Sequence, residues 1–268
     1  MTFLENHPLQ LSGNKKYFNF LSLTFYKIIM DETIKLSRST VEKYLNCPRC
    51  CVLDKKHKIK PPSLPFTLNI AVDNLCKNEF DYYRERQESH PLFIEHNIDA
   101  VPFKHKDIDI WRSNFKGIRY KSTEHNYDFG GAVDDVWQKK NGELIIVDVK
   151  ATSRNNFDWF ETFNKYDYAK AYKRQLEMYQ WLFRKNGFKV ADEAYLLYFN
   201  GKKNEKFFNN QLKFDVHFIK LDCSSAWVEG KVIETVKLLR SNLFPSPSFK
   251  CEYCNYLKKR WQCHKINY

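Results

Sequence analysis

The segment that most constrains this chain is GGAVDDVWQKKNGELIIVDVK, residues 130–150, because it places charges inside two runs that otherwise resemble core strands. The runs flank a KKNG sequence, which is typical of a β-hairpin turn. Asp134, Asp135, Asp148 and Lys150 all lie within them. Burying one unpaired carboxylate is costly, and burying several close together is worse. The segment therefore needs a compensating partner for its carboxylates.

The hairpin turn decides which aspartate faces Asp148. Alternate residues of a strand share one face, so Asp148 and Lys150 point the same way. A three-residue loop, residues 140–142, with its glycine in the left-handed region, places Asp134 opposite Asp148. A two-residue Asn-Gly turn places Asp135 there instead. The sequence leaves both registers open.

Two carboxylates on one face of a sheet predict a cation between them. Hard oxygen ligands suit Mg²⁺ or Mn²⁺. Such an ion can orient a water, lower the pKa of that water and neutralise charge that grows on a phosphate. A neighbouring lysine can position or deprotonate the water and stabilise the transition state. An exposed hairpin with an ordinary Asp–Lys ion pair would explain the same residues without a metal.

The charge balance indicates a polyanionic partner. The chain of 268 residues has a formal net charge of +12 at pH 7, and such an excess attracts nucleic acid. Its 16 tyrosines and 6 tryptophans could add the stacking surfaces that single-strand binding channels use. Alternatively, the aromatic residues fill the core and the lysines only keep the protein in solution.

Six of the eight cysteines lie near the two ends of the expected domain. The sequences CPRC, residues 47–50, and CEYC, residues 251–254, share the C-x-x-C spacing that lets two thiolates reach one metal. No secretory signal precedes them, so a metal site is favoured over disulfides. Cys47, Cys50, Cys251 and Cys254 could form a tetrahedral zinc site, and reduced cysteines without a metal are the alternative.

The chain divides into an N-terminal extension, residues 1–35, and one α/β domain, residues 36–268, with the cysteine cluster joining residues 47–51 and 251–263. No segment reaches the roughly 20 apolar residues of a membrane span, so we expect a cytoplasmic protein with no membrane contact. Periodicity predicts helices and strands along the domain. The expected helices are residues 36–50, 68–86, 165–186 and 225–242, and the later expected strands are residues 193–200 and 212–222.

Three motifs in order resemble the RecB-like branch of the PD-(D/E)XK nuclease superfamily, which includes CRISPR-associated nucleases. That branch has a G-x-x-D strand, a D-x-K strand and then a Q-x-x-x-Y helix. The matching residues here are Gly131-Ala-Val-Asp134, Asp148-Val-Lys150 and Gln175-Leu-Glu-Met-Tyr179. The resemblance implies a restriction-endonuclease-like fold, a central mixed β-sheet flanked by helices.

The resemblance also implies roles for these residues. Asp134 and Asp148 would be metal ligands, Asp135 remaining a rival of Asp134, and Lys150 would be the catalytic lysine. Gln175 and Tyr179 would orient the site and contact the DNA backbone.

RecB-like nucleases usually carry a further ligand, a histidine in a G-x-x-x-H context on an early helix. This chain has Asn69-Ile-Ala-Val-Asp73 there. Asp73 could supply an oxygen ligand in its place, and Glu79 is a weaker substitute. The alternative for Asp73 is an ordinary acidic residue in the first turn of a helix.

Some RecB-like nucleases resemble this chain in their cysteines as well. In them one N-terminal cysteine and three C-terminal cysteines hold a [4Fe–4S] cluster. This resemblance implies Cys47, Cys251, Cys254 and Cys263 as ligands, and the gap before Cys263 is longer than the family's. Cys50 offers the alternative zinc ligand, and His264 is a weaker substitute ligand.

We therefore expect a metal-dependent DNA nuclease that acts on single strands or strand ends, in DNA repair, recombination or defence. The alternative is a catalytically silent DNA-binding or scaffold module of the same fold, and a metal-dependent RNA hydrolase is a third reading. DNA is the expected partner. The chain lacks a G-x-x-x-x-G-K-[ST] motif, so any unwinding would come from a separate helicase.

Overall fold

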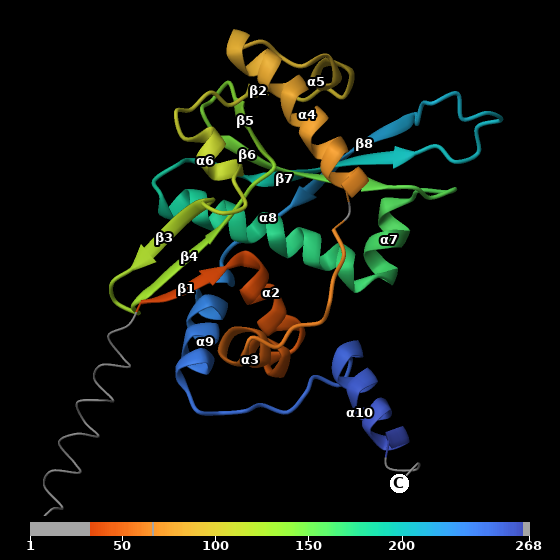
Figure 1. The fold of residues 1–268 in the computed structure, drawn as a ribbon. Helices are drawn as coiled ribbons and strands as arrows, with labels where there is room; N and C mark the ends of the chain where they lie inside the picture. The colour runs from red at the N-terminus through yellow and green to blue at the C-terminus, as the bar shows by residue number, and fades with distance from the viewer. Residues whose placement is uncertain (1–32, 66, 265–268) are drawn as a thin grey trace, which may run out of the picture.

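The computed structural model describes residues 33–65 and 67–264. A five-stranded sheet in the order β2-β5-β6-β7-β8 forms its centre, and a three-stranded sheet in the order β1-β4-β3 lies beside it (Figure 1). The strands are β1 (Ile34–Ser37), β2 (Ala100–Pro102), β3 (Ile118–Ser122), β4 (Tyr127–Gly131), β5 (Asp135–Lys139), β6 (Leu144–Thr152), β7 (Val190–Gly201) and β8 (Phe214–Asp222).

The helices surround these sheets (Figure 1). They are α2 (Arg38–Asn46), α3 (Pro48–His57), α4 (Thr67–Arg86), α5 (Pro91–Glu95), α6 (Ile108–Arg112), α7 (Trp159–Lys165), α8 (Asp167–Lys185), α9 (Val228–Arg240) and α10 (Glu252–His264). None of the helices in the described ranges is long and apolar enough to cross a bilayer.

The first expected helix, residues 36–50, is in fact a strand end and two helices. Ser37 ends β1 and caps α2 by accepting from the backbone N–H of Thr40. Cys47 is extended, and Pro48 begins α3 at the position where a missing N–H costs nothing. Strand β1 pairs with β4 from Ile34 onward, so the domain begins inside the stretch that we assigned to the extension. Most of that extension, residues 1–32, lies outside the described residues.

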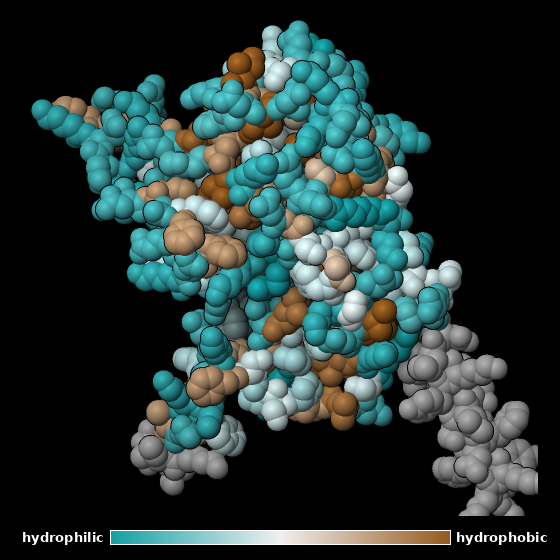
Figure 2. All heavy atoms as spheres, turned by 180° about the vertical axis from the view of Figure 1, so that it is seen from behind, coloured by the Kyte–Doolittle hydropathy of each residue, from teal (hydrophilic) through white to brown (hydrophobic). Residues whose placement is uncertain are grey.

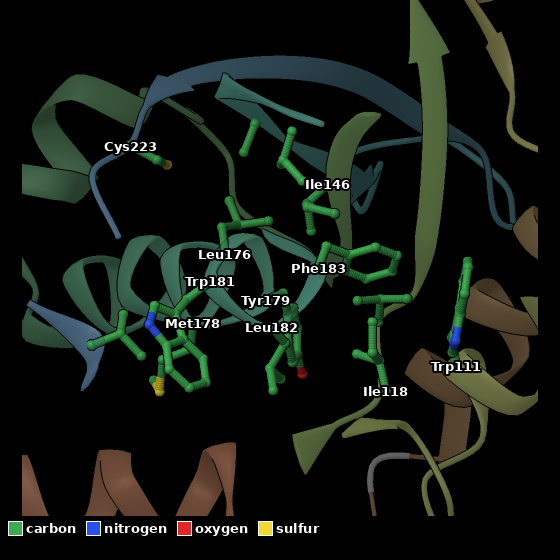
Figure 3. Packing of buried hydrophobic residues seen from close by; sticks show 14 of the residues in the cluster. Trp111, Ile118, Ile146, Leu176, Met178, Tyr179, Trp181, Leu182, Phe183 and Cys223 are labelled. Atoms are coloured by element: carbon green, nitrogen blue, oxygen red, sulfur yellow. The ribbon is translucent and has the colours of Figure 1, made fainter. Parts of the chain in front are cut away.

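The central sheet is mixed, as predicted. Strands β6 and β7 are parallel, and the other pairs of this sheet are antiparallel. Side chains of β6 alternate between two buried clusters: Ile146 joins the cluster of α8, and Val147 joins the cluster that holds Phe80 of α4. Figure 3 shows Ile146 close to Leu176 and Phe183 of α8. Helices therefore cover both faces of the sheet, which is the predicted α/β arrangement.

The β5–β6 hairpin has the three-residue loop. Asp135 pairs with Val147, and the backbone N–H of Lys139 donates to the carbonyl of Glu143 over 2.9 Å. Gly142 adopts a φ of 82°, in the left-handed region that glycine adopts without strain. One step further along this register, Asp134 stands opposite Asp148.

Strands β7 and β8 continue beyond the sheet into an arm, residues 202–213. The arm projects from the body of the protein and is mostly hydrophilic (Figure 2). It leaves from the carboxyl end of β7, beside the carboxyl end of β6, where Thr152 pairs with Asn200. The arm thus lies on the side of the sheet toward which the D-x-K strand runs.

Candidate active site

Asp148 is the central side chain of the site. It lies on β6 and is fully buried. Its Oδ1 accepts a hydrogen bond of 2.7 Å from Nε2 of Gln175 on α8, and its Oδ2 forms an ion pair with Lys150. Asp148 and Lys150 share the α8 face of the sheet because they are two residues apart on one strand.

Asp134 lies beside this pair, just before β5 begins. Its Oδ2 accepts a hydrogen bond of 2.8 Å from the backbone N–H of Val149, so the carboxylate is fixed across the hairpin. The strand register places Asp134 opposite Asp148, and its negative charge adds to the rise in the pKa of Asp148 that burial causes. The structure thus brings together the aspartate of the G-x-x-D motif and both charges of the D-x-K motif.

The pKa values of Asp148 and Lys150 reflect burial and the charges close to them. Burial raises the pKa of Asp148 to about 7, Asp134 adds to the rise, and Lys150 opposes it. Burial would lower the pKa of Lys150, but Asp148 and Asp134 together raise it. The two carboxylates therefore favour the ammonium form of Lys150, which can stabilise negative charge.

Asp73 reaches the site from α4. Helix α4 packs against β6, burial raises the pKa of Asp73, and the negative charge of Asp134 raises it further. Its Oδ2 pairs with Lys77 at 2.7 Å, whereas its Oδ1 is buried without a hydrogen-bond partner. Glu79, the other acidic residue considered on this helix, instead bonds His90 at 3.0 Å. Of the two, the structure brings only Asp73 to the site.

These carboxylates fit a divalent cation. Oδ1 of Asp73 is buried without a hydrogen-bond partner, and Oδ2 of Asp148 is buried with the ammonium group of Lys150 beside it. A buried carboxylate oxygen without a donor is costly. An ion that prefers oxygen ligands would satisfy these atoms, and Mg²⁺ and Mn²⁺ have this preference.

Helix α8 contributes Gln175 and Tyr179 to the buried side of the site. Nε2 of Gln175 also lies 3.2 Å from the hydroxyl of Tyr179. Tyr179 packs so closely against Gly131 that an added Cβ at Gly131 would lie 2.6 Å from its ring, which explains the glycine of the G-x-x-D motif. Gln175 and Tyr179 are 8% and 3% exposed. Gln175 orients Asp148, and Tyr179 contacts Gln175. Their contact with a DNA backbone stays a prediction.

Asp135, the rival ligand, points away from the site. It is buried, forms an ion pair with Arg84 and accepts a hydrogen bond of 3.2 Å from Nε1 of Trp137. Sequence reasoning missed Arg84, which is 51 residues earlier in the chain. An arginine on a mostly apolar helix face was the available signal.

Sequence reasoning also missed the aromatic surroundings of Lys150. Its ammonium group lies 4.6 Å from the ring centre of Tyr172. Tyr172 precedes Gln175 by three residues, so the two share the face of α8 that lies on β6. The attraction between a cation and an aromatic face holds the ammonium group at the edge of the carboxylate cluster.

The model of the PD-(D/E)XK nuclease superfamily matches residues 71–263, which is most of the chain. The chain belongs to this superfamily. The match covers Asp73 and all three motifs of the site. Proteins of this superfamily are nucleases that hydrolyse phosphodiester bonds, and they generally use divalent metal ions.

Two solved structures resemble this PD-(D/E)XK protein at low identity. One is a protein called SSO0001, with 16% identity, a TM-score of 0.44, and coverage of 89% of this chain and 94% of that one. The other is a candidate exonuclease from Eubacterium rectale, with 14% identity, a TM-score of 0.43, and coverage of 93% and 94%. The chain matches none of the curated proteins.

A second cluster, apart from the superfamily motifs, joins the two ends of the domain. The Sγ atoms of Cys47, Cys50, Cys251 and Cys254 all lie within 4.8 Å of one another. Cys50 lies 3.5 Å from both Cys251 and Cys254, and Cys47 lies 3.9 Å from Cys254. Burial would raise the pKa of Cys47, but hydrogen bonds from the backbone N–H groups of Ser248 and Cys50 lower it to about 7.

The assembled cysteines differ from the set that the iron–sulfur resemblance implies. Cys263 is exposed on α10 and is not part of the group, and Cys50 takes the fourth place. The physical reason is the rigid helical spacing of α10, which begins directly after Cys251 and carries Cys263 more than two turns beyond Cys254. The side chain of His264 lies outside the described residues. Cys51, Cys76 and Cys223 are buried elsewhere.

Proposed function

We propose that this protein is a divalent-metal-dependent nuclease of the RecB-like branch that hydrolyses phosphodiester bonds of DNA. The observation that carries the proposal is the shared contact of one fully buried carboxylate, Asp148, with Lys150 and Gln175. A buried aspartate held by a neutral amide and a lysine, with Asp134 beside it, is a poor structural element and a suitable ligand for a cation.

Asp73, Asp134 and Asp148 would hold Mg²⁺ or Mn²⁺. When bound, the ion supplies an activated water and neutralises charge on the phosphate. The ammonium group of Lys150 would bind the non-bridging oxygens of the phosphate, where negative charge grows in the transition state. Gln175 is a positioning residue, because its amide fixes the carboxylate plane of Asp148.

Single strands or strand ends are the proposed substrate. The supporting features are the net charge of +12 and the aromatic rings around Lys150, which suit unpaired nucleotides better than a smooth duplex. Work in DNA repair, recombination or defence, alongside a helicase supplied by another chain, would fit this substrate. The cytoplasm is the proposed location.

The direct test is cleavage of end-labelled DNA as a single strand, a duplex and a circular single strand, and of a matching RNA, in Mg²⁺, Mn²⁺ or EDTA. We expect cutting of linear single-stranded DNA in either metal and none in EDTA. Cutting of the circle would show that strand ends are not required. Cutting in EDTA, or of RNA alone, would contradict the proposal.

The second candidate is a DNA-binding module that does not cut. Lys150 forms an ion pair with Asp148. If this pair persists when metal is supplied, it favours the binding module over the nuclease. Binding of the same DNA with no cleavage in any metal would favour this candidate over the nuclease.

The cysteine group is proposed to hold one zinc ion rather than the [4Fe–4S] cluster that we first expected. A tetrahedral site with Zn–S bonds of about 2.3 Å has sulfur–sulfur edges of about 3.8 Å. Three of the six sulfur–sulfur separations are 3.5–3.9 Å, close to this value, and all six are within 4.8 Å. In a four-iron cluster each thiolate binds a different iron, so the sulfur atoms would be further apart. The ion would act structurally, by joining segments some 200 residues apart.

A further inference from the structure

A pocket of about 180 Å³ opens directly beside Lys150, at the carboxyl ends of β6 and β7. It is smaller than the roughly 300–1,000 Å³ of pockets for drug-sized ligands, so it suits one small ring system. Four of its eight lining residues are aromatic, and two more are the cations Lys150 and Arg154. The residues that matter here are Lys150, Arg154, Phe157, Tyr168, Tyr172 and Tyr198.

The aromatic walls come from three separate parts of the chain. Tyr198 belongs to β7, Tyr168 and Tyr172 belong to α8, and Phe157 precedes α7. The ring centres of Phe157 and Tyr198 are 4.9 Å apart, and those of Tyr168 and Tyr172 are 5.5 Å apart. These rings support one another and still border an open space. Flat aromatic faces around such a space are what an unstacked nucleobase requires.

The pocket is held open by hydrogen bonds that do not depend on a ligand. The side chain of Asn200 accepts from the backbone N–H of Arg154 over 2.8 Å and donates to its carbonyl over 3.1 Å. The hydroxyl of Ser153 donates to the carbonyl of Gly201 over 2.8 Å. Because this segment is tied to β7, a ligand would meet a preformed site and would lose little affinity to ordering it.

Positive charge borders the aromatic walls on two sides. The guanidinium group of Arg154 donates to the hydroxyl of Tyr168 and lies 5.0 Å from the ring centre of Tyr166. The ammonium group of Lys150 lies 4.6 Å from the ring centre of Tyr172. Cations next to ring faces match a nucleotide, which combines a planar base with a phosphate on each side.

We propose that this pocket receives one unpaired nucleobase of the DNA strand, next to the phosphate that Lys150 contacts, with Tyr172 as the stacking face. The proposal rests on the proposed function in one respect, the placement of a DNA phosphate at Lys150. A base inside a duplex is stacked and paired, so it must leave the duplex to enter. The pocket therefore selects single strands and frayed ends.

The test measures the coupling between one base and one ring. A series of short fluorescent oligothymidylates, each with a single abasic residue at a different position, is bound to the full-length protein in EDTA and followed by fluorescence anisotropy. We expect the wild-type protein to lose affinity about 5- to 150-fold at one position, the equivalent of about 1–3 kcal/mol. In the Tyr172→Leu variant, an abasic residue at the same position should lower the affinity by less than about threefold.

Tyr172→Phe is the matched control, because it keeps the ring and should keep the sensitivity to the abasic residue. Tyr168→Ala is a second variant that leaves the contact between Lys150 and Tyr172 intact, and it should weaken the coupling partly. Circular dichroism checks that each variant is folded. Equal losses in the wild type and Tyr172→Leu at every position, or no binding of the oligonucleotides, would overturn the pocket proposal.

The measurement separates this proposal from the proposed function because EDTA prevents metal-dependent cutting. A protein that cuts single-stranded DNA but shows no position-specific loss remains a nuclease without a base pocket. A protein that shows the loss at one position but never cuts has the pocket without the activity.

Discussion

Gln175 on α8 fixes Asp148 on β6: its Nε2 donates a hydrogen bond of 2.7 Å to Oδ1 of the carboxylate. The two residues are 27 positions apart and both are buried. The contact leaves Oδ2 of Asp148 directed at Lys150. The position of α8 therefore determines which oxygen of Asp148 lies beside Lys150.

Gln175→Ala should weaken metal use rather than unfold the protein. Without the amide, Asp148 loses the donor that sets its orientation, and such losses lower metal affinity or activity by about 10- to 100-fold. The measurement is cleavage rate against Mg²⁺ concentration, in which the midpoint should move to higher concentration. Gln262→Ala, at an exposed position of α10, is the control. An unchanged midpoint in Gln175→Ala would contradict the positioning role.

The neighbouring aspartates should separate activity from stability. Asp134→Asn should abolish cleavage with little change in the free energy of unfolding, because Asp134 is half-buried and lies at the site. Asp135→Asn removes one of the two carboxylates that pair with the buried Arg84, the other being that of Asp81, so it should lower the free energy of unfolding by up to about 3–5 kcal/mol. Urea unfolding and a cleavage assay on both variants check this. The reverse pattern would mean that Asp135 is the ligand.

The cysteine group should contain one zinc ion per protein, measured by elemental analysis. Cys50→Ser should lose the zinc and lower the midpoint of thermal unfolding, because the ion closes a loop between the two ends of the domain. Cys263→Ser is the matched control and should keep the zinc, since Cys263 lies outside the group. A brown protein with broad absorbance near ~400 nm, from thiolate–iron charge transfer, would contradict the zinc assignment.

Stability should fall in mild acid through His90. This imidazole is buried, and its Nδ1 accepts a hydrogen bond of 3.1 Å from the backbone N–H of Leu92. Burial lowers the pKa of His90 below its usual 6.5, against the opposing effect of Glu79. As the pH falls, the unfolded state therefore binds a proton before the folded state does. The contribution of neutral His90 to stability is present above about pH 6.5 and is lost as the pH falls.

The variant His90→Asn keeps a side chain that can cap α5 but does not titrate. The difference in free energy of unfolding between the wild type and this variant should shrink from pH 7 to pH 5. Urea unfolding at several pH values measures it. A difference that stays constant or grows in acid would show that His90 is not held neutral.

The sequence predicted the hairpin that carries Asp134, Asp148 and Lys150 better than it predicted the surroundings of this hairpin. The alternation of apolar and polar residues and the KKNG turn predicted the hairpin. They allowed two registers, because a loop that is one residue longer or shorter turns each side chain of a strand to the opposite face. The hydrogen bond from the backbone N–H of Lys139 to the carbonyl of Glu143 closes the three-residue loop and selects one register, and local propensity does not determine it. Proline often begins a helix and rarely continues one, so Pro48 indicates a helix boundary. The expected helix, residues 36–50, was wrong to continue through it.

Long-range partners were beyond the sequence. Arg84 meets Asp135 across 51 residues, and Cys50 meets Cys251 across 201 residues. Which cysteine completes the fourfold group depends on how the chain returns from α9 to α10, and spacing alone cannot specify that path. The aromatic pocket beside Lys150 likewise forms only when β7, α8 and the segment before α7 come together.

The most direct test of the account compares DNA cleavage by the wild type, Lys150→Ala and Lys140→Ala in Mg²⁺. Lys140 is an exposed lysine at the far turn of the same hairpin, so it matches the change in charge without touching the site. We predict that Lys150→Ala lowers the cleavage rate by at least about 100-fold, as loss of a transition-state contact does, and that Lys140→Ala cuts like the wild type. Equal cutting by Lys150→Ala and the wild type would contradict the claim that this edge of the sheet is the active site.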